Sequence, residues 1–291
     1  MNKITVENLI SLIQKEFDNS DIFFGHGTFS AIDEAIWLIS SILKIPFNNI
    51  HLYLNKEVRE NDLKVIQNIA KERIASKKPL AYLLKEGWLR ELSFFVDDRV
   101  LVPRSLIADL IDSKFYPWIE NLKNIKNVLD LCTGSGCLGI LLAYRFNNLI
   151  VDISDISKDA IDVANINIKK HNLEKRVTAI QSDLFQNLKN DSYDLIVSNP
   201  PYVNLDSMQI LPKEYQLEPQ NALASGKDGL DHTRNIIAQA KKYLKDNGKL
   251  FIEIGHNRDE VEKVFKDLNI WWVDTESGSD YIFMIEKKDL P

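Results

Sequence analysis

The stretch NVLDLCTGSGCLGILLAYRF, residues 127–146, decides the fold. Its first five residues form a short apolar run that is typical of a buried strand. The turn DLCTGSGC (130–137) follows, and residues 137–146 then have the composition of a helix. Gly134 and Gly136 allow the turn to adopt backbone angles that are closed to other residues and to approach a ligand closely. The amides that begin the following helix supply hydrogen-bond donors. The stretch therefore predicts a strand, a ligand-binding turn and a helix in succession.

The same alternation of strand and helix continues to the end of the chain. It predicts an α/β fold with a mostly parallel, doubly wound, Rossmann-like sheet. Strands are expected at 149–154, 177–181, 193–199 and 249–255, helices at 159–171 and 230–244, and a final strand pair at 271–274 and 281–286.

The N-terminal part of the chain has a different pattern, with apolar residues at helical spacing and no nucleotide loop or metal cluster. We expect a helical bundle over 1–88 that recognises the substrate. A linker with a β-hairpin and the start of a helix is expected over 89–112, with Asp97-Asp98 as the hairpin turn. The α/β domain then comprises 113–291.

Charge is uneven along the 291 residues, whose net charge is −6. Residues 1–90 carry a net +1 and residues 91–291 a net −7. A protein that binds duplex DNA through its phosphates is usually basic, so this balance disfavours direct duplex binding. No stretch reaches 18 apolar residues, so we expect no membrane span. The two cysteines, Cys132 and Cys137, fit a reducing compartment, and cytoplasmic localisation is expected.

The spacing of Gly134, Gly136 and Gly139 fits both a nicotinamide cofactor and S-adenosylmethionine. Asp130, at the end of the preceding strand, favours S-adenosylmethionine because its carboxylate can hold the methionine ammonium group. An acidic residue about 20 positions beyond such a loop commonly binds the ribose hydroxyls. Asp155 is preferred for this role, with Asp152 as the alternative.

Two further motifs follow the third and fourth expected strands. Asp183 and Leu184 are placed to contact an adenine ring. Asn199-Pro200-Pro201-Tyr202 ends its strand in two prolines, which remove donors and fix the backbone. The Asn199 oxygen and the Pro200 carbonyl can accept the two hydrogens of a planar –NH2 group, and Tyr202 can stack on it. This motif predicts methyl transfer to an amide or an amino group. The five histidines lack metal-ligand spacing, so no metal is expected.

With the glycine loop and NPPY together, the chain resembles the HemK-like protein-glutamine methyltransferases over most of its length. Within them it is similar to the PrmB branch, whose substrate is a glutamine of the large-subunit ribosomal protein L-three. Four motifs carry that closer resemblance. They are GHGT (25–28) followed by Asp33-Glu34-Ala35, VDDRVLVPRS (96–105), EYQLEP (214–219) with LASGKDGLD (223–231), and the cysteine of DLCTGSGC.

The resemblance implies roles for individual residues. It implies that the S-adenosylmethionine site is lined by Cys132, Thr133, Gly134, Ser135 and Gly136, that Asp155 binds ribose, and that Leu184 lies beside adenine. It implies that the glutamine amide is held by Asn199, Pro200, Pro201 and Tyr202. It also places Arg104 and Glu218 on the substrate side of the site. Two residues depart from the family pattern, which has tryptophan at Leu184 and proline at Leu106. The loop 203–228 is expected to cover the substrate.

These observations predict an enzyme that transfers a methyl group from S-adenosylmethionine to the side-chain amide nitrogen of a glutamine in ribosomal protein L-three. The acidic catalytic domain would suit a basic ribosomal protein. Three alternatives stay open. They are a peptide chain release factor glutamine methyltransferase, a DNA adenine-amino methyltransferase, and a cofactor-binding ribosome assembly factor without catalysis.

Overall fold

The fold is that of a computed structural model, which describes residues 4–190, 192–276 and 278–291. The chain divides into two compact units. The N-terminal unit extends to Gly87 and also includes Pro212–Leu217, whereas the C-terminal unit comprises Trp88–Leu211 and Glu218–Pro291. The sequence placed 212–217 in the catalytic domain. It instead belongs to the N-terminal unit because Glu214 is buried there in an ion pair with Arg73.

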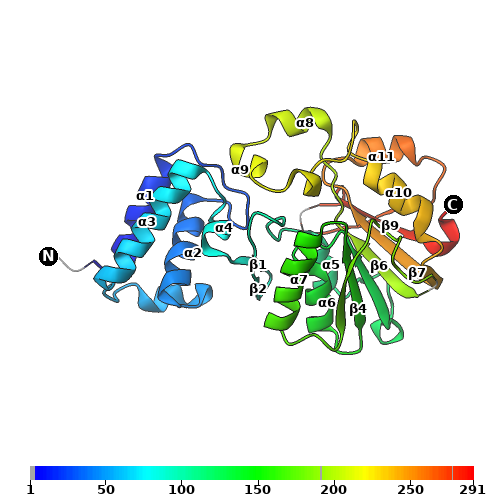
Figure 1. Cartoon of the computed structure of the whole chain (residues 1–291), viewed down its shortest axis with the longest axis horizontal. Helices are drawn as coiled ribbons and strands as arrows, with labels where there is room; N and C mark the ends of the chain where they lie inside the picture. The colour runs from blue at the N-terminus through cyan, green and yellow to red at the C-terminus, as the bar shows by residue number, and fades with distance from the viewer. Residues whose placement is uncertain (1–3, 191, 277) are drawn as a thin grey trace. The chain divides into compact units, whose positions relative to one another are not determined.

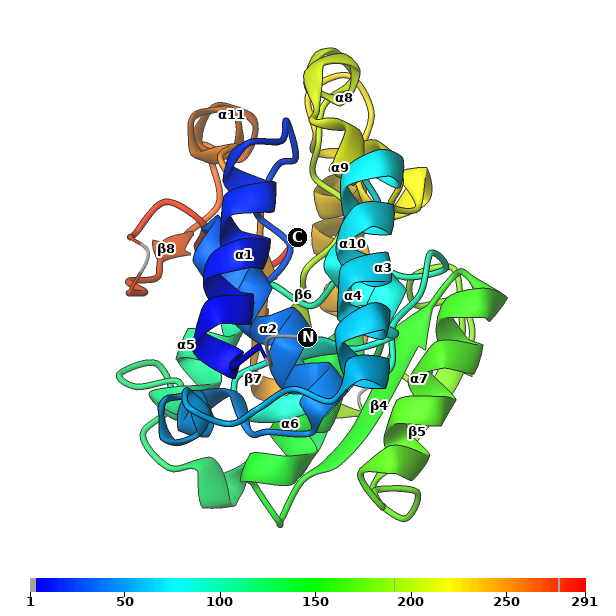
Figure 2. The ribbon, with the colours of Figure 1, turned by 90° about the vertical axis from the view of Figure 1, so that its left-hand side faces the viewer.

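The N-terminal unit is a bundle of helices (Figures 1 and 2). α2 contacts α1, α3 and α4, and its packing against them forms the centre of the bundle. The helices are α1 (Val6–Asp18), α2 (Ala31–Leu43), α3 (Glu60–Ser76), α4 (Leu80–Leu84) and α9 (Lys213–Gln216), with a 3-10 helix at Phe47–Tyr53. Thr5 and Ser30 begin α1 and α2 by accepting a backbone N–H with their side chains, which is why these helices start where they do.

The C-terminal unit is built on a seven-stranded sheet in the order β5-β4-β3-β6-β7-β9-β8. The strands are β3 (Asn127–Leu131), β4 (Ile150–Asp155), β5 (Val177–Gln181), β6 (Tyr193–Ser198), β7 (Leu244–Glu253), β8 (Trp271–Trp272) and β9 (Ile282–Glu286). The first five in this spatial order are parallel, and β9 pairs antiparallel with both β7 and β8. The mostly parallel sheet predicted from the sequence is therefore confirmed.

Helices cover both faces of this sheet (Figure 1). α6 (Cys137–Arg145) contacts β3, β4 and β5, and it packs between α5 (Ile107–Asp112) and α7 (Lys158–Lys170). On the opposite face, α10 (Asp231–Ala240) and α11 (Arg258–Val264) contribute to one apolar core with alternate residues of the strands. β3 shows the alternation, since Leu129 and Leu131 join that core while Asp130 faces α6. The remaining elements are α8 (Leu205–Ile210) and 3-10 helices at Leu122–Asn124, Gln220–Ala222 and Lys287–Asp289.

This part of the chain forms a hairpin, but it is not the predicted one with strands on either side of Asp97-Asp98. β1 (Gly87–Leu89) and β2 (Leu92–Phe94) form a separate two-stranded sheet, so the turn is Arg90-Glu91 and not Asp97-Asp98. Arg90 adopts a φ of 55°, which reverses the chain. Asp97 makes a turn of its own after β2, in which its side chain accepts hydrogen bonds from the backbone and guanidinium of Arg99. Within the described ranges, every helix is too short or too polar to cross a lipid bilayer.

Candidate functional site

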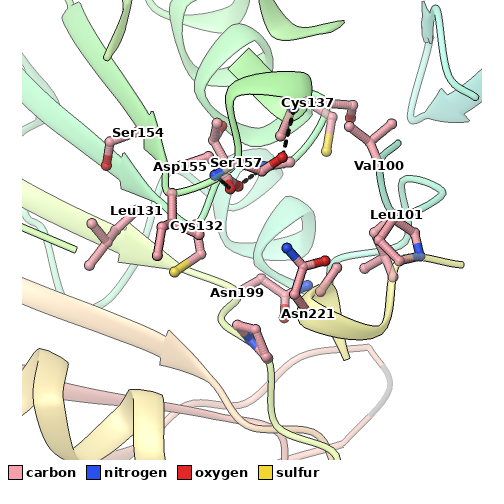
Figure 3. A pocket seen from close by; sticks show the side chains of 18 of the residues that line it. Val100, Leu101, Leu131, Cys132, Cys137, Ser154, Asp155, Ser157, Asn199 and Asn221 are labelled. Atoms are coloured by element: carbon pink, nitrogen blue, oxygen red, sulfur yellow. Dashed lines mark hydrogen bonds between the residues drawn. The ribbon is translucent and has the colours of Figure 1, made fainter. Parts of the chain in front are cut away.

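A pocket opens at the carboxyl ends of the parallel strands of the C-terminal unit (Figure 3). This is where ligands bind in open α/β sheets. Its lining comes from five segments that are far apart in the chain, namely Arg99–Ser105, Leu131–Ser135 with Cys137 and Leu138, Ser154–Ser157 with Ala160, Ser182–Leu184, and Asn199 with Pro201. Pro219, Asn221, Ala222 and His232 complete it. Most of the predicted site residues therefore meet in one cavity.

The glycine loop follows β3 directly. Cys132, Gly134 and Gly136 adopt φ values of 61°, 55° and 82°, which turn the chain sharply between β3 and α6. A Cβ built on Gly134 would have no neighbour within 4 Å, so the left-handed backbone and not crowding favours glycine there. Thr133 ties the loop to the next strand, because its N–H donates to the Ser154 carbonyl at 2.9 Å.

Asp130 lies beneath this loop and is 1% exposed. Its Oδ2 accepts hydrogen bonds from the Thr133 hydroxyl and, at 2.9 Å, from the N–H of Gly139. Burial raises the pKa of this carboxyl to about 7, against the lowering effect of the two hydrogen bonds. Among the described residues, Asp130 and Gly136 are not part of the pocket lining. Oδ2 of Asp130 therefore holds the loop in shape, while its Oδ1 has no hydrogen-bond partner in the described part of the chain.

Asp155 lies at the end of β4 and faces the pocket (Figure 3). Its Oδ2 accepts the N–H of Gly134 and its Oδ1 the N–H of Ser157, each at 2.9 Å. These bonds fix the carboxylate between the glycine loop and the start of α7, while burial raises its pKa. The alternative, Asp152, accepts a hydrogen bond from the Tyr193 hydroxyl at 2.8 Å, which occupies it within the sheet.

The segment after β5 brings Asp183 and Leu184 into the lining. Leu184 adopts a φ of 46°, so the chain bends sharply at this position. The next residue, Phe185, is fully buried and stacks on Tyr243 with ring centroids 4.5 Å apart. That stacking anchors the bend below the pocket and leaves Leu184 partly buried beside it.

The NPPY segment follows β6, and contacts with Asn257 and Gly255 fix the position of its Tyr202. Asn199 and Pro201 line the pocket, whereas among the described residues Pro200 and Tyr202 do not. The Tyr202 carbonyl accepts a hydrogen bond from the Asn257 side chain at 2.7 Å. A Cβ on Gly255 would lie 2.6 Å from the Tyr202 ring, so the glycine is what lets the ring pack there.

Arg104 and Glu218 meet each other. Both guanidinium Nη atoms of Arg104 donate to the two carboxylate oxygens of Glu218 at 2.7 Å, and the Val102 N–H donates to Glu218 at 3.0 Å. Glu218 is 3% exposed and lies outside the pocket lining as the structure describes it, whereas Arg104 contributes to it. The pair joins the segment before α5 to the segment that contributes Pro219, Asn221 and Ala222 to the pocket.

A second buried carboxylate supports the same segment. Glu253, at the end of β7, accepts hydrogen bonds from the Ser105 hydroxyl at 2.5 Å and from the Leu106 N–H at 2.9 Å. Burial raises its pKa to about 7. Leu106 stands where the family pattern has proline, and proline has no N–H to make this bond.

Sequence reasoning missed part of the lining. The motif at 96–105 indicates the branch of the family but gives no binding role to residues 100–103, although Val100 and Leu101 form one wall of the pocket (Figure 3). Asn221 also lines the pocket, and no sequence signal indicates it. His232 also lines the pocket, and its ring Nδ1 lies 2.9 Å from the Ser225 hydroxyl. Burial lowers the pKa of His232, which favours its neutral form.

The two cysteines are not activated nucleophiles. Burial raises the pKa of Cys137 to about 12 and also raises the pKa of Cys132, so both thiols stay protonated at neutral pH. Within the part of the chain that the structure describes, no group of three or more His, Cys, Asp or Glu side chains is placed to hold a metal ion.

Comparison with known proteins identifies similar methyltransferases. Residues 110–213 match the model of the methyltransferase small domain. A ribosomal protein uL3 glutamine methyltransferase of Neisseria meningitidis is 41% identical over 286 residues, which cover 98% of this chain and 94% of that protein. A protein of the same name from Burkholderia pseudomallei is 39% identical over 294 residues, covering 99% and 96%.

Among solved structures, the hMettl16 catalytic domain is similar with a TM-score of 0.51 at 15% identity, covering 78% of this chain and 81% of that one. That likeness concerns the fold. The two sequence relatives cover 98% and 99% of this chain and therefore extend over both units. The chain belongs to the family of ribosomal protein uL3 glutamine methyltransferases.

Proposed function

We propose that this protein transfers a methyl group from S-adenosylmethionine to the side-chain amide nitrogen of a glutamine in ribosomal protein uL3. One observation carries the proposal. Asn199, which can accept a hydrogen bond from a planar amide, lines the same pocket as the glycine loop and the Asp155 carboxylate. Substrate amide and methyl donor would therefore meet inside one cavity of the C-terminal unit.

The residues fit S-adenosylmethionine. Gly134 leaves open space where a side chain would otherwise stand, and the loop presents backbone amides at the start of α6. Asp155 supplies a fixed carboxylate for ribose hydroxyls, and Asp183 and Leu184 supply a polar and an apolar group for adenine. Asp130 shapes the loop through its Oδ2, which accepts from Thr133 and Gly139. Its Oδ1 is buried without a hydrogen-bond partner among the described residues and is the proposed acceptor for the methionine ammonium group.

When bound, S-adenosylmethionine supplies an electrophilic methyl group on sulfur. Asn199 and the Pro200 carbonyl would accept the two N–H groups of the glutamine amide and direct its nitrogen toward that methyl. They would also stabilise the positive charge that develops on nitrogen as the C–N bond forms and the C–S bond breaks. The nitrogen then loses one proton, and the acidity that alkylation confers removes the need for a strong base.

The net charge of −7 over residues 91–291 supports a basic protein as substrate over duplex DNA. The relatives' names favour uL3 over a release factor. We place the reaction in the cytoplasm, because a ribosomal protein is available there during assembly.

Incubation with S-adenosylmethionine labelled in its methyl group tests the proposal. Purified uL3, release factors and DNA are offered in parallel, and the labelled product is digested and sequenced by mass spectrometry. Label on a glutamine of uL3 is the expected result. Label on a release factor or on adenine would select another substrate, and no transfer to any of them would indicate a protein without catalysis.

A further inference from the structure

Motifs of the N-terminal unit meet around one buried arginine. Arg73 of α3 donates from Nε to Glu34 of α2 at 2.5 Å and from Nη1 to Glu214 of α9 at 3.1 Å. Its third nitrogen, Nη2, donates to the Phe23 carbonyl at 2.8 Å. The side chains of Arg73, Glu34 and Glu214 are 1%, 3% and 2% exposed. Glu34 belongs to the segment 33–35 and Glu214 to EYQLEP, two of the motifs that mark this branch of the family.

The GHGT segment (25–28) completes the cluster. The Thr28 hydroxyl donates to Glu34 at 3.3 Å, and the Tyr215 hydroxyl donates to the Gly25 carbonyl at 3.5 Å. The rings of His26 and Tyr215 lie 4.3 Å apart. A Cβ on Gly25 would lie 2.7 Å from the Tyr215 hydroxyl, so the glycine allows the close approach. GHGT and EYQLEP are therefore two sides of one packed cluster.

Glu214 lies within the loop 203–228, which begins and ends in the C-terminal unit. The base of this loop is closed by hydrogen bonds of 2.8 Å from Val203 N–H to the Leu223 carbonyl and 2.9 Å from Ser225 N–H to the Val203 carbonyl. Glu218 is held by Arg104 of the C-terminal unit, and four positions earlier Glu214 is held by the N-terminal unit. EYQLEP thus carries two buried carboxylates, each of which is anchored in a different unit.

A buried cluster of two carboxylates and one guanidinium is a costly way to stabilise a domain. Burial raises the pKa of Glu34, which shows that desolvation outweighs the attraction of Arg73 for that group. Apolar residues of the same volume often stabilise a core equally well or better, whereas an ion cluster admits one arrangement of its members. Its benefit here is a defined position for the segment that carries Glu214.

We propose that Glu214 is a positioning residue for methyl transfer, which holds Pro212–Leu217 in the N-terminal unit and thereby orders the loop after NPPY before uL3 binds. The inference rests on the proposed function. Ordering such a loop at the moment of binding would cost conformational entropy, and a pre-ordered loop avoids that cost. Loss of the anchor should therefore weaken the use of uL3, while the cofactor pocket of the C-terminal unit stays intact.

The test compares Glu214→Gln with Glu60→Gln. Glu60 is on the same helix as Arg73 and pairs with Lys64, but both side chains are about two-thirds exposed, so this control removes an equal charge from the surface. We expect KM for full-length uL3 to rise at least about tenfold in Glu214→Gln, with the Kd for S-adenosylmethionine changed less than about twofold. Glu60→Gln should leave both the KM and the Kd unchanged. An unchanged KM for uL3, or an equal loss of cofactor affinity, would overturn the proposal.

Limited proteolysis separates this proposal from the proposed function. Cleavage within 203–228 should be faster in Glu214→Gln than in wild type or Glu60→Gln, whatever the substrate is. If wild type methylates another protein but the loop is still cleaved faster, the anchor stands and the assigned substrate is wrong. If Glu214→Gln fails to fold, Tyr215→Phe removes one hydroxyl from the cluster and keeps its ring. This variant should show the same changes in smaller degree, and unchanged cleavage and KM in it would contradict the proposal.

Discussion

Arg104 and Glu218 are 114 positions apart in the chain and bind each other through two parallel hydrogen bonds of 2.7 Å. This fork-to-fork geometry is the most specific pairing that a guanidinium and a carboxylate make. Arg104 follows Val102 and Pro103 in the wall of the pocket, and Pro219 beside Glu218 also lines it. The pair therefore fixes two walls of the cavity against each other, and the expected role of both residues on the substrate side stays a prediction.

Replacing Glu218 with Gln should destabilise the C-terminal unit and weaken cofactor binding together. The substitution leaves the Arg104 guanidinium without its charged partner, and Arg104 is partly exposed, so we expect a loss of about 2 kcal/mol in the free energy of unfolding. Urea denaturation measures this loss, and calorimetric titration measures the affinity for S-adenosylmethionine. A matched control is Glu262→Gln, which removes an exposed pair with Arg258. Normal stability of Glu218→Gln would show that the pair is dispensable.

Replacing Asn199 with Ala should stop methyl transfer while cofactor binding largely survives. Loss of one preorganised hydrogen-bonding group at the reacting atom commonly lowers kcat by about 100- to 1000-fold. Single-turnover assays with uL3 and titration with S-adenosylmethionine give the two quantities. Asn165→Ala, an exposed site on α7 whose side chain donates to the Ile161 carbonyl, is the control. Transfer at a normal rate in Asn199→Ala would remove Asn199 from the reaction.

Much of this architecture could be predicted from the sequence, because the signals are local. The strands at 127–131 and 177–181 have the predicted bounds, since each is an apolar run closed by turn residues. The prediction of a hairpin turn at Asp97-Asp98 was wrong, because Asp97 forms a turn with Arg99 that involves no strand pairing. Residues 212–217 belong to the N-terminal unit through contacts such as that between Arg73 and Glu214, and a contact between such distant positions cannot be predicted from a local sequence pattern.

In the site, too, residues at the ends of strands could be predicted from local signals, whereas residues in loops could not. Asp155 and Asn199 could be placed at the pocket because each lies at the carboxyl end of an expected strand, and these ends meet at one edge of a parallel sheet. Asn221 comes from a 3-10 helix in the middle of a long loop, so no periodicity announces its position. The alternation of side chains along β3 turns Asp130 toward Gly139 of α6, a contact that no local pattern indicates, and its contact with the ligand stays a prediction.

Asp155→Asn should raise the Kd for S-adenosylmethionine by at least about tenfold, because an amide cannot accept both backbone N–H groups and also bind ribose hydroxyls. The carboxylate now accepts the N–H groups of Gly134 and Ser157. Asp152→Asn is the control, since its carboxylate bonds to Tyr193 within the sheet. Titration calorimetry compares the two variants. Equal effects of both substitutions would contradict the assignment of Asp155.

Two glycines of the cofactor segment should respond differently to alanine. A Cβ on Gly139 would lie 2.2 Å from Ile153, so α6 must move away from β4, and we expect a loss of about 2–3 kcal/mol in unfolding free energy. A Cβ on Gly134 meets nothing within 4 Å, and its φ of 55° should cost only about 1 kcal/mol. Denaturant unfolding of both variants checks the order. A larger loss in Gly134→Ala would mean that backbone strain outweighs crowding in this loop.

Glu253→Gln should change how stability depends on pH. Burial raises the pKa of Glu253 from 4.5 to about 7, so between these values the folded protein retains a proton that the unfolded chain has released. Unfolding then releases a proton, and the free energy of unfolding of the wild type falls as pH rises from about 4.5 to about 7.

Glutamine does not titrate, and its oxygen can still accept from Ser105 and Leu106. Relative to wild type, the variant should therefore gain about 2–3 kcal/mol between pH 5 and pH 8. Asp130 titrates in the same range but is present in both proteins, so its effect cancels in the comparison. Parallel stability profiles, measured by urea denaturation at pH 5 and pH 8, would show that Glu253 is ionised throughout.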